Sequence, residues 1–419
     1  MRRLKVLISA YACNPLATEA SYPGEAILGW NLVKQISKRH DIWVFTRVYN
    51  RDAIEEEINK GNISNANFIY VDFPRPFSLL LKNFIGFRIY YLFWQMKTYF
   101  VAKQLQARLK FDLFHQITFN NDWMPSFIGA FLNLPFIWGP VGGGQKTPPS
   151  LLIELGLKGF IDEIIRENGQ SFWRHNPLRN RCVKRASAIL VCNKDTRRKI
   201  SCPDKKIHFF PVNGILPEDL IPEEELSSLL GETLLRNDFS VIYAGRLDPI
   251  KGLGLAVEAF ALFIKKYPDS RFEIIGEGAE ELRLRKLAYM LGVESKIDFI
   301  SWLSRKELFA RIRRADTFLF PSFRDGGGAV VVEAMASAKP VICLDTAGPA
   351  FHIRDEWGIK IAPKNSLYVI QEIEKSLEKL YLDKDLRIRM GEAARKRAEE
   401  FYLWDKLGER LQEIYEEVL

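Results

Sequence analysis

The stretch Pro321-Ser-Phe-Arg-Asp-Gly-Gly-Gly-Ala-Val-Val-Val-Glu-Ala-Met-Ala-Ser-Ala-Lys-Pro-Val-Ile342 decides the fold predicted for this chain. The apolar run 317–320 before it reads as a buried strand that ends at Pro321, because proline donates no ladder hydrogen bond. After three glycines, an apolar segment with helical character, 329–338, leads into a second strand at 341–344. Strand, glycine loop, helix and strand in this order predict a βαβ unit.

The glycine loop and two nearby carboxylates predict a binding site. Gly326, Gly327 and Gly328 place bare backbone N–H groups at the start of a helix, where an anion binds readily. Asp325 precedes the loop, and Glu333 lies in the helix that follows it. An anion-binding loop between two carboxylates suits a charged ligand with many hydroxyl groups, such as a nucleotide sugar. The alternative is a glycine turn beside a surface Asp and a surface Glu.

This stretch resembles a known family. It contains an acid, a Glu after seven further residues, and then Ala-Met-Ala and Pro-Val-Ile. This pattern is similar to the signature of the retaining nucleotide-sugar glycosyltransferases of family four, which have the GT-B fold. The resemblance implies an α/β protein of two Rossmann-like, doubly wound domains that face each other across a cleft. It also implies a C-terminal helix that crosses back to the N-terminal domain. The family usually has Glu at both acid positions, whereas this chain has the shorter Asp325 at the first.

Chain length and a break in the alternation of strands and helices predict two domains. A chain of 419 residues exceeds the usual size of a single hydrophobic core. The segment 211–229 contains a turn signal and three prolines, so we place the linker there. We therefore expect an N-terminal, acceptor-side domain at 1–212 with the closing helix 402–419. A nucleotide-sugar-binding domain is expected at 213–401.

Apolar runs that alternate with helical segments predict a parallel sheet in each domain. We expect strands at 4–9, 42–45, 68–71, 112–115, 134–138, 188–192 and 207–210 in the first domain, and at 239–244, 272–275, 297–300, 317–320 and 341–344 in the second.

A second loop carries two cations. Arg246 and Lys251 lie among glycines between the strand 239–244 and a helix, and such a loop suits a pyrophosphate. Both residues match the family's phosphate-binding element position for position. The resemblance further implies that Glu333 accepts hydrogen bonds from ribose hydroxyls and that Asp325 holds the transferred sugar. Alternatively, Lys251 is only a solvated residue at a helix start.

Two residues of the first domain are also candidates for the site. Gly24 stands where the helix 25–38 begins, at the ligand-facing edge of an open α/β sheet, and we assign it to donor binding. His115 ends the strand 112–115 at the same edge. The family usually has a His of the catalytic region at this position, often as the second of two closely spaced His residues. This chain has a single His here, His115. His115 is therefore either a catalytic residue or a hydrogen-bonded structural histidine.

The charge pattern predicts anionic partners. The formal net charge is +8, which suits phosphate-bearing ligands or an anionic membrane surface, and no nucleic-acid-binding motif is present. The segment 73–111 contains many aromatic residues and no acid, a composition that fits either a peripheral membrane contact or a helix with one buried aromatic face. Its cations are Arg75, Lys82, Arg88, Lys97, Lys103, Arg108 and Lys110.

Cysteines and hydropathy limit the location and the cofactors. Five scattered cysteines without metal-ligand spacing indicate free thiols in a reducing compartment. The sequence contains no run of 18 apolar residues without charge, so we predict no membrane-spanning helix. We expect a cytoplasmic protein, with a peripheral contact at the inner membrane face if 73–111 binds lipid. We expect no metal and no cofactor besides the nucleotide sugar, which is a substrate.

The leading hypothesis is a hexosyltransferase. It moves a sugar, without metal and with retention, from a nucleotide-diphosphate sugar to a saccharide or lipid-linked acceptor in polysaccharide or glycolipid biosynthesis. One alternative keeps the fold and changes the reaction to that of a nucleotide-sugar epimerase or another GT-B enzyme. A phosphorylase of this kind would need a pyridoxal lysine, which we could not locate. Another alternative is a non-catalytic nucleotide-sugar-binding protein with an eroded site.

Overall fold

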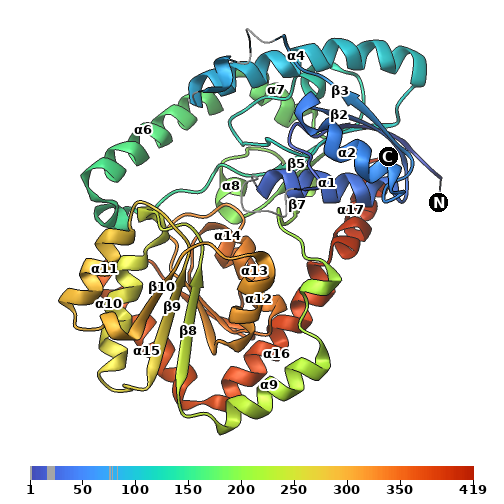
Figure 1. Ribbon diagram of the computed structural model, residues 1–419. Helices are drawn as coiled ribbons and strands as arrows, with labels where there is room; N and C mark the ends of the chain where they lie inside the picture. The colour runs from blue at the N-terminus through green and yellow to red at the C-terminus, as the bar shows by residue number, and fades with distance from the viewer. Residues whose placement is uncertain (1, 17–23, 75–76, 78, 83) are drawn as a thin grey trace. The chain divides into compact units, whose positions relative to one another are not determined.

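The computed structural model describes residues 2–16, 24–74, 77, 79–82 and 84–419, and it divides into two compact units (Figure 1). The first unit comprises Met1–Gly144, Gly169–Val212 and Trp404–Leu419, and the second comprises Gln145–Asn168 and Asn213–Leu403. The closing helix thus groups with the first unit. Gln145–Asn168, which the predicted boundaries include in the first domain, groups with the second unit instead.

The first unit is built on a sheet of seven parallel strands in the order β3-β2-β1-β4-β5-β6-β7. The strand order reverses between β1 and β4, which pair directly, and such a switch point opens a crevice at the carboxyl ends of the strands. The strands are β1 Lys5–Ser9, β2 Asp41–Thr46, β3 Ala66–Tyr70, β4 Leu113–Gln116, β5 Phe136–Val141, β6 Ala188–Val191 and β7 Ile207–Phe209.

The second unit repeats this design with six parallel strands in the order β10-β9-β8-β11-β12-β13. Its switch point lies between β8 and β11. The strands are β8 Phe239–Ala244, β9 Ser270–Ile275, β10 Ile297–Ile300, β11 Thr317–Phe320, β12 Val341–Leu344 and β13 Gly358–Ile361.

Helices cover both faces of each sheet, so the strands are buried on both sides and read as continuous apolar runs. In the second unit, α10, α11 and α15 lie on one face, and α12, α13 and α16 on the other (Figure 1). The helices of the first unit are α1 Gly24–Ser37, α2 Arg51–Asn59, α4 Phe84–Leu109, α5 Phe127–Phe131, α7 Pro177–Arg185, α8 Lys194–Arg198 and α17 Trp404–Val418. Those of the second are α9 Glu223–Leu235, α10 Leu253–Ile264, α11 Glu281–Met290, α12 Arg305–Arg314, α13 Ala329–Ala336, α14 Ala347–His352, α15 Ser366–Leu382 and α16 Lys384–Phe401, while α6 Gly156–Arg174 has residues in both units.

The doubly wound α/β architecture agrees with the prediction, and several local features do not. The predicted linker 211–229 contains the start of α9, and strand β13 was not predicted. The helix α6 was not predicted either. The segment 156–174 carries apolar residues at helical spacing, a pattern that predicts a helix and that the predicted elements omitted. β13 has only four residues, too few for a period of two to be recognised.

The aromatic residues of the basic segment 73–111 are divided between two faces of α4. Tyr90, Tyr91 and Trp94 are buried in the core of the first unit, whereas Phe93 and Phe100 are exposed. The structure therefore contains the buried aromatic face, and it also leaves apolar side chains on the surface beside the cations. Arg75 and the side chain of Lys82 lie outside the described parts of the chain.

Two glycines of α1 provide a matched test of the packing. A Cβ atom on Gly29 would lie 2.0 Å from the backbone oxygen of Ala12, whereas a Cβ atom on Gly24 would meet nothing within 4 Å. Because a backbone oxygen can move away only if the main chain shifts, we expect Gly29→Ala to lower the free energy of unfolding by about 1–3 kcal/mol. Gly24→Ala should leave it unchanged. Urea denaturation measures both, and equal stability of the two variants would contradict this packing.

Candidate functional site

Two predicted loops meet at the switch point of the second sheet. β8 and β11 pair directly, with Val241 opposite Thr317, so the loops that follow them start side by side. The N–H of Phe323 donates to the carbonyl of Ile250 over 2.9 Å, which ties one loop to the other. The two glycine-containing loops thus form one structure at the carboxyl edge of the strands, where open α/β sheets bind ligands.

Asp325 is the centre of this structure. One carboxylate oxygen accepts hydrogen bonds from the N–H groups of Gly327 at 3.0 Å and Gly328 at 2.6 Å. The other oxygen lies 2.5 Å from the Nζ atom of Lys251. Burial opposes the ionisation of Asp325, but the charge and hydrogen bond of Lys251 and the two N–H groups together hold its pKa below the usual value. Asp325 is therefore a buried, ionised carboxylate.

This geometry corrects one expectation. The N–H groups of Gly327 and Gly328 were predicted to hold a phosphate, and in the structure they bind the carboxylate of Asp325. A short acidic side chain readily accepts from the backbone N–H groups two and three residues further along the chain, as Asp325 does in the turn before α13. Gly328 has φ of 61°, a left-handed conformation that glycine adopts without steric cost, and this turn aims the N–H groups at Asp325.

The two predicted phosphate-binding cations differ in exposure. The side chain of Lys251 is buried, with Nζ lying 5.3 Å from the centroid of the Phe320 ring. The side chain of Arg246 is 68% exposed and forms an ion pair with Asp248 over 3.0 Å. A positively charged group deep in the site and another at its surface can therefore contact an anionic ligand at two depths.

Glu333 belongs to a chain of charges that sequence reasoning missed. Its carboxylate accepts from Arg305 at the start of α12 over 2.7 Å, and Arg305 also binds Asp219 over 2.9 Å. Burial raises the pKa of Glu333, and the guanidinium of Arg305 opposes that rise. Arg305 and Asp219 carry no motif, and only the packing of α12 against α13 brings them to Glu333.

His352 is a second residue that the sequence did not reveal. Its Nε2 atom contacts the backbone oxygen of Gly327, and its Nδ1 atom lies 2.7 Å from the hydroxyl of Tyr402. Burial lowers the pKa of His352 to about 4, so the ring is neutral at pH 7. A carbonyl oxygen only accepts, so Nε2 carries the hydrogen and Nδ1 accepts from Tyr402. Because Asn213 also donates to Gly327, over 2.6 Å, the glycine loop is fixed from two sides.

His115 is buried and hydrogen-bonded, which favours the structural one of the two roles that the sequence left open, over the catalytic one. Its side chain is fully buried, with 0% exposure, in β4 of the first unit. Nε2 donates to the backbone oxygen of Gly139 over 2.7 Å, and Nδ1 accepts from the hydroxyl of Tyr415 over 2.7 Å. Both ring nitrogens are therefore engaged, and the bond to Tyr415 links α17 to the sheet. Gly24, the other candidate in this unit, is exposed at the start of α1.

Comparisons with known proteins agree with this arrangement. Residues 232–397, which include both loops, match the model of the family described as glycosyl transferases group 1. The matched region belongs to that family. The match confirms the predicted resemblance at this level, and with it the expectation of a glycosyltransferase-type enzyme.

Relatives and a solved structure extend the comparison beyond the matched region. An uncharacterized glycosyltransferase of Methanocaldococcus jannaschii is 24% identical over 341 residues, which cover 78% of this chain and 81% of that protein. A D-inositol 3-phosphate glycosyltransferase of Corynebacterium jeikeium is 32% identical over 184 residues, 42% of this chain and 43% of the relative. The Anabaena protein HepE, solved in complex with UDP, is similar over 99% of both chains with a TM-score of 0.63 and 15% identity. This likeness confirms the predicted GT-B fold.

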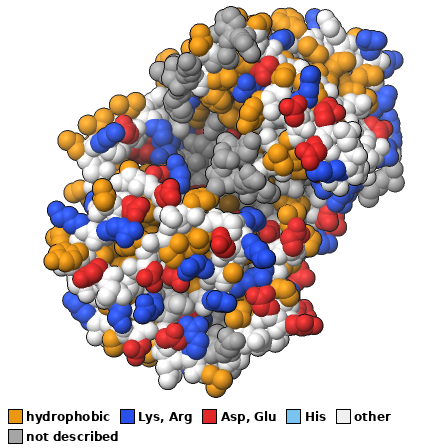
Figure 2. Space-filling view, viewed as in Figure 1, with side chains coloured by type: hydrophobic (Ala, Val, Ile, Leu, Met, Phe, Trp, Pro, Cys, Tyr) orange, Lys and Arg blue, Asp and Glu red, His pale blue; other side chains and the backbone are white. Residues whose placement is uncertain are grey.

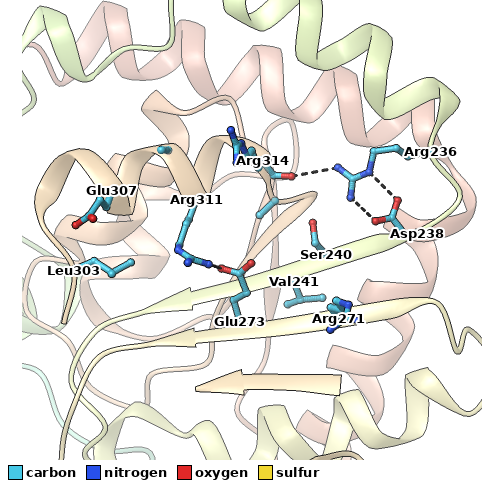
Figure 3. Close-up of a pocket in the computed structure, with 12 residues that line it drawn as sticks. Arg236, Asp238, Ser240, Val241, Arg271, Glu273, Leu303, Glu307, Arg311 and Arg314 are labelled. Atoms are coloured by element: carbon cyan, nitrogen blue, oxygen red, sulfur yellow. Dashed lines mark hydrogen bonds and ion pairs between the residues drawn. The ribbon is translucent and has the colours of Figure 1, made fainter. Parts of the chain in front are cut away.

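The cavity drawn in Figure 3 lies elsewhere in the second unit. It has a volume of about 540 Å³ and lies beside Ser240, near the start of β8, whereas Arg246 follows the end of that strand. Its charged side chains are largely paired with one another, for example Arg311 with Glu273 over 3.0 Å. The cavity contains none of the predicted site residues.

Two features are absent from the described residues: a metal-binding cluster and a membrane-spanning helix. No group of three or more His, Cys, Asp or Glu side chains within them could hold a metal ion. Nor does any helix in the described part of the chain have the length and apolar character needed to cross a membrane.

The buried His115 gives a prediction for the stability of this chain. Burial lowers its pKa to about 4, below the value of about 6.5 expected in the unfolded chain. As the pH falls, the unfolded state takes up the proton first, so the stability that neutral His115 contributes is lost between these values. Relative to His115→Gln, the wild type should lose about 2 kcal/mol of unfolding free energy from pH 7 to pH 5.

Denaturation at both pH values measures this difference. His175→Gln, which removes an exposed histidine, is the control. A stability gap between wild type and His115→Gln that stays constant from pH 7 to pH 5 would show that His115 is not held neutral by burial.

Proposed function

We propose that this chain transfers a sugar from a nucleotide-diphosphate sugar to a saccharide or lipid-linked acceptor, with retention of configuration and without a metal ion. The observation that carries the proposal is the ion pair of Lys251 with Asp325 at the carboxyl edge of β8 and β11. In it, Lys251, the proposed phosphate-binding cation, lies within one hydrogen bond of Asp325, the proposed sugar-binding acid, and both belong to the region that matches the family.

The cations would bind the diphosphate. Negative charge grows on the departing nucleoside diphosphate in the transition state, and a preorganised donor at such a position is typically worth about 3 kcal/mol. The ammonium of Lys251 has three donors, of which Asp325 takes one, so the others can meet phosphate oxygens. Arg246, largely exposed, can swing from Asp248 to the same group. The complex of HepE with UDP supports the choice of UDP as the first nucleotide to test.

The two acids would bind the two sugars of the donor. Glu333, oriented by Arg305, would accept hydrogen bonds from the ribose hydroxyls. Asp325 would accept from hydroxyls of the transferred sugar and stabilise positive charge on its ring. Its ionised state, held by Lys251 and the glycine loop, suits that role. Retention is proposed from the family resemblance, and metal independence from the cations available for the diphosphate.

We also propose a peripheral contact of the 73–111 segment with an anionic membrane at the cytoplasmic face. The exposed Phe93 and Phe100 of α4 support this contact, with Lys103 and Arg108 on its C-terminal part and Lys110 directly after it. Lys97 and Arg88 are less suited to it. Lys97 donates to the backbone oxygen of Asp72 over 2.6 Å, and Arg88 lies over the ring of Trp123.

The first test concerns the diphosphate. Lys251→Ala should weaken the binding of UDP, or of whichever nucleoside diphosphate binds best, by about 1.5–3 kcal/mol, because it removes a buried charged donor. Lys266→Ala is the matched control, since Lys266 pairs with Glu374 on the surface of the same unit. Calorimetry measures both. Wild-type affinity in Lys251→Ala would remove this loop from the proposed site.

The second test separates the two acids. Glu333→Gln should weaken nucleotide binding by about 1–2 kcal/mol and reduce transfer as well, because it removes a charged acceptor for the ribose. Asp325→Asn keeps an oxygen for the N–H groups of Gly327 and Gly328, so nucleotide affinity should survive. Transfer should fall by about 10²–10³-fold, because the charge facing the sugar is lost.

Calorimetry measures nucleotide affinity, and hydrolysis of labelled nucleotide sugar measures catalysis. Loss of nucleotide affinity in Asp325→Asn would contradict the division of roles. Tight nucleotide binding by the wild type, with neither hydrolysis nor transfer, would favour the non-catalytic binding protein.

A further inference from the structure

Arg324, the residue before Asp325, is a largely buried cation whose donors are unused. Its side chain is 20% exposed, and its Nε atom is fully buried without a partner. In the part of the chain that the structure describes, its other N–H groups make no hydrogen bond either. Exposed cations and acids are interspersed over the second unit (Figure 2), where water satisfies them. A buried guanidinium lacks that supply, so its free donors indicate a ligand.

The nearest carboxylate does not supply the missing hydrogen bonds. Glu163 of α6 lies 3.4 Å from Arg324 as an ion pair. Its two oxygens accept from the guanidinium of Arg166 over 2.7 and 3.0 Å, and from the N–H of Thr147 over 3.0 Å. All of these residues belong to the second unit. Glu163 is therefore held in place without Arg324.

The charges around Arg324 are balanced, although its hydrogen bonds are not. The charged groups that act on its guanidinium are Arg166, Glu163, Glu167 and Asp325. Two of the three acids already have cations of their own, so the third, Glu167, balances the charge of Arg324. A further negative charge at this place would be opposed by the acids. The ligand that fits is an uncharged group with oxygen atoms that accept hydrogen bonds.

The free donors lie beside the acid proposed to hold the transferred sugar. Asp325 contacts Lys251 in the loop after β8, whereas the preceding Arg324 contacts α6. The segment that leads to α6 lies against the same glycine loop, since the amide nitrogen of Gln145 would be 3.1 Å from a Cβ atom on Gly326. The guanidinium therefore lies between the glycine loop and α6, next to the proposed sugar-binding carboxylate.

We propose that Arg324 is a sugar-binding residue, which donates hydrogen bonds to the oxygen atoms of an uncharged sugar held by Asp325. A carboxylate only accepts and a guanidinium only donates, so together the two side chains recognise hydroxyl groups in both directions. This inference rests on the proposed function, because it requires that the transferred sugar binds at Asp325. It adds a donor to the site and limits the transferred sugar to an uncharged one.

The test compares the binding of UDP and UDP-glucose to Arg324→Met, which has an unbranched side chain without donors. The ratio of the two affinities isolates the contribution of the sugar. We expect this ratio to fall about 10–100-fold in the variant, because charged donors to the sugar are lost. The affinity for UDP alone should be unchanged. Calorimetry measures both ligands, and a wild-type ratio in Arg324→Met overturns the proposal.

Thermal unfolding of the free protein separates sugar binding from a structural role. Because Arg324 has no hydrogen bond to lose, Arg324→Met should melt at or above the wild-type temperature. Arg166→Met leaves the buried Glu163 without its main partner and should melt lower. An equal fall in both variants makes Arg324 a structural residue and overturns the proposal. Arg285→Met, which removes an exposed ion pair with Glu281 in the same unit, is the control that should keep the wild-type affinity ratio.

UDP-glucuronate tests the charge of the sugar, since a carboxylate replaces the hydroxymethyl group of UDP-glucose. The wild type should bind it less tightly than UDP-glucose, because the acids around Arg324 oppose another negative charge. Tighter binding of UDP-glucuronate that is lost in Arg324→Met assigns the arginine to an anion and overturns the uncharged sugar. An unchanged affinity ratio with UDP binding retained defeats this inference alone. Failure of the wild type to bind any nucleoside diphosphate defeats the proposed function as well.

Discussion

The ion pair between Lys251 and Asp325 connects the two loops on which the rest of the site depends. Both side chains are largely buried, at 10% and 19% exposure, so each charge relies on the other for compensation. Removal of one partner from such a pair leaves an uncompensated charge and typically costs a few kcal/mol. Asp325 in turn holds the N–H groups of Gly327 and Gly328. The position of the glycine loop therefore depends on this contact between the loops that follow β8 and β11, together with the hydrogen bonds from His352 and Asn213 to Gly327.

The parallel sheets were predictable because their strands are buried on both faces. β8, β10, β11 and β12 begin and end where the apolar runs predicted. β13 was missed because Gly358-Ile-Lys-Ile361 alternates apolar with other residues over only four positions. The helix α6 was omitted although its apolar residues recur at helical spacing. Those residues do not face a core, so they gave no indication that the segment packs on this domain.

Site residues were predictable from the sequence only where they lie next to a strand end or a run of glycines. Lys251, Asp325 and Glu333 could be named because strand ends and glycines mark their positions. Arg305 and His352 act through contacts between elements distant in sequence, which no local pattern encodes. The two roles of His115 stayed open for the same reason: its partner Tyr415 lies 300 residues away, and only the fold shows that both ring nitrogens are engaged. The donors assigned to a phosphate were likewise taken by Asp325, a competition that motif spacing cannot reveal.

The central claim is that the loops after β8 and β11 bind a nucleoside diphosphate. A crystal structure of the protein with UDP tests it most directly. The account predicts phosphate oxygens within hydrogen-bond distance of Lys251 and Arg246, and ribose hydroxyls on the carboxylate of Glu333. Nucleotide bound elsewhere, for example in the arginine-lined cavity near the start of β8, with Lys251 still paired to Asp325 alone, would contradict it.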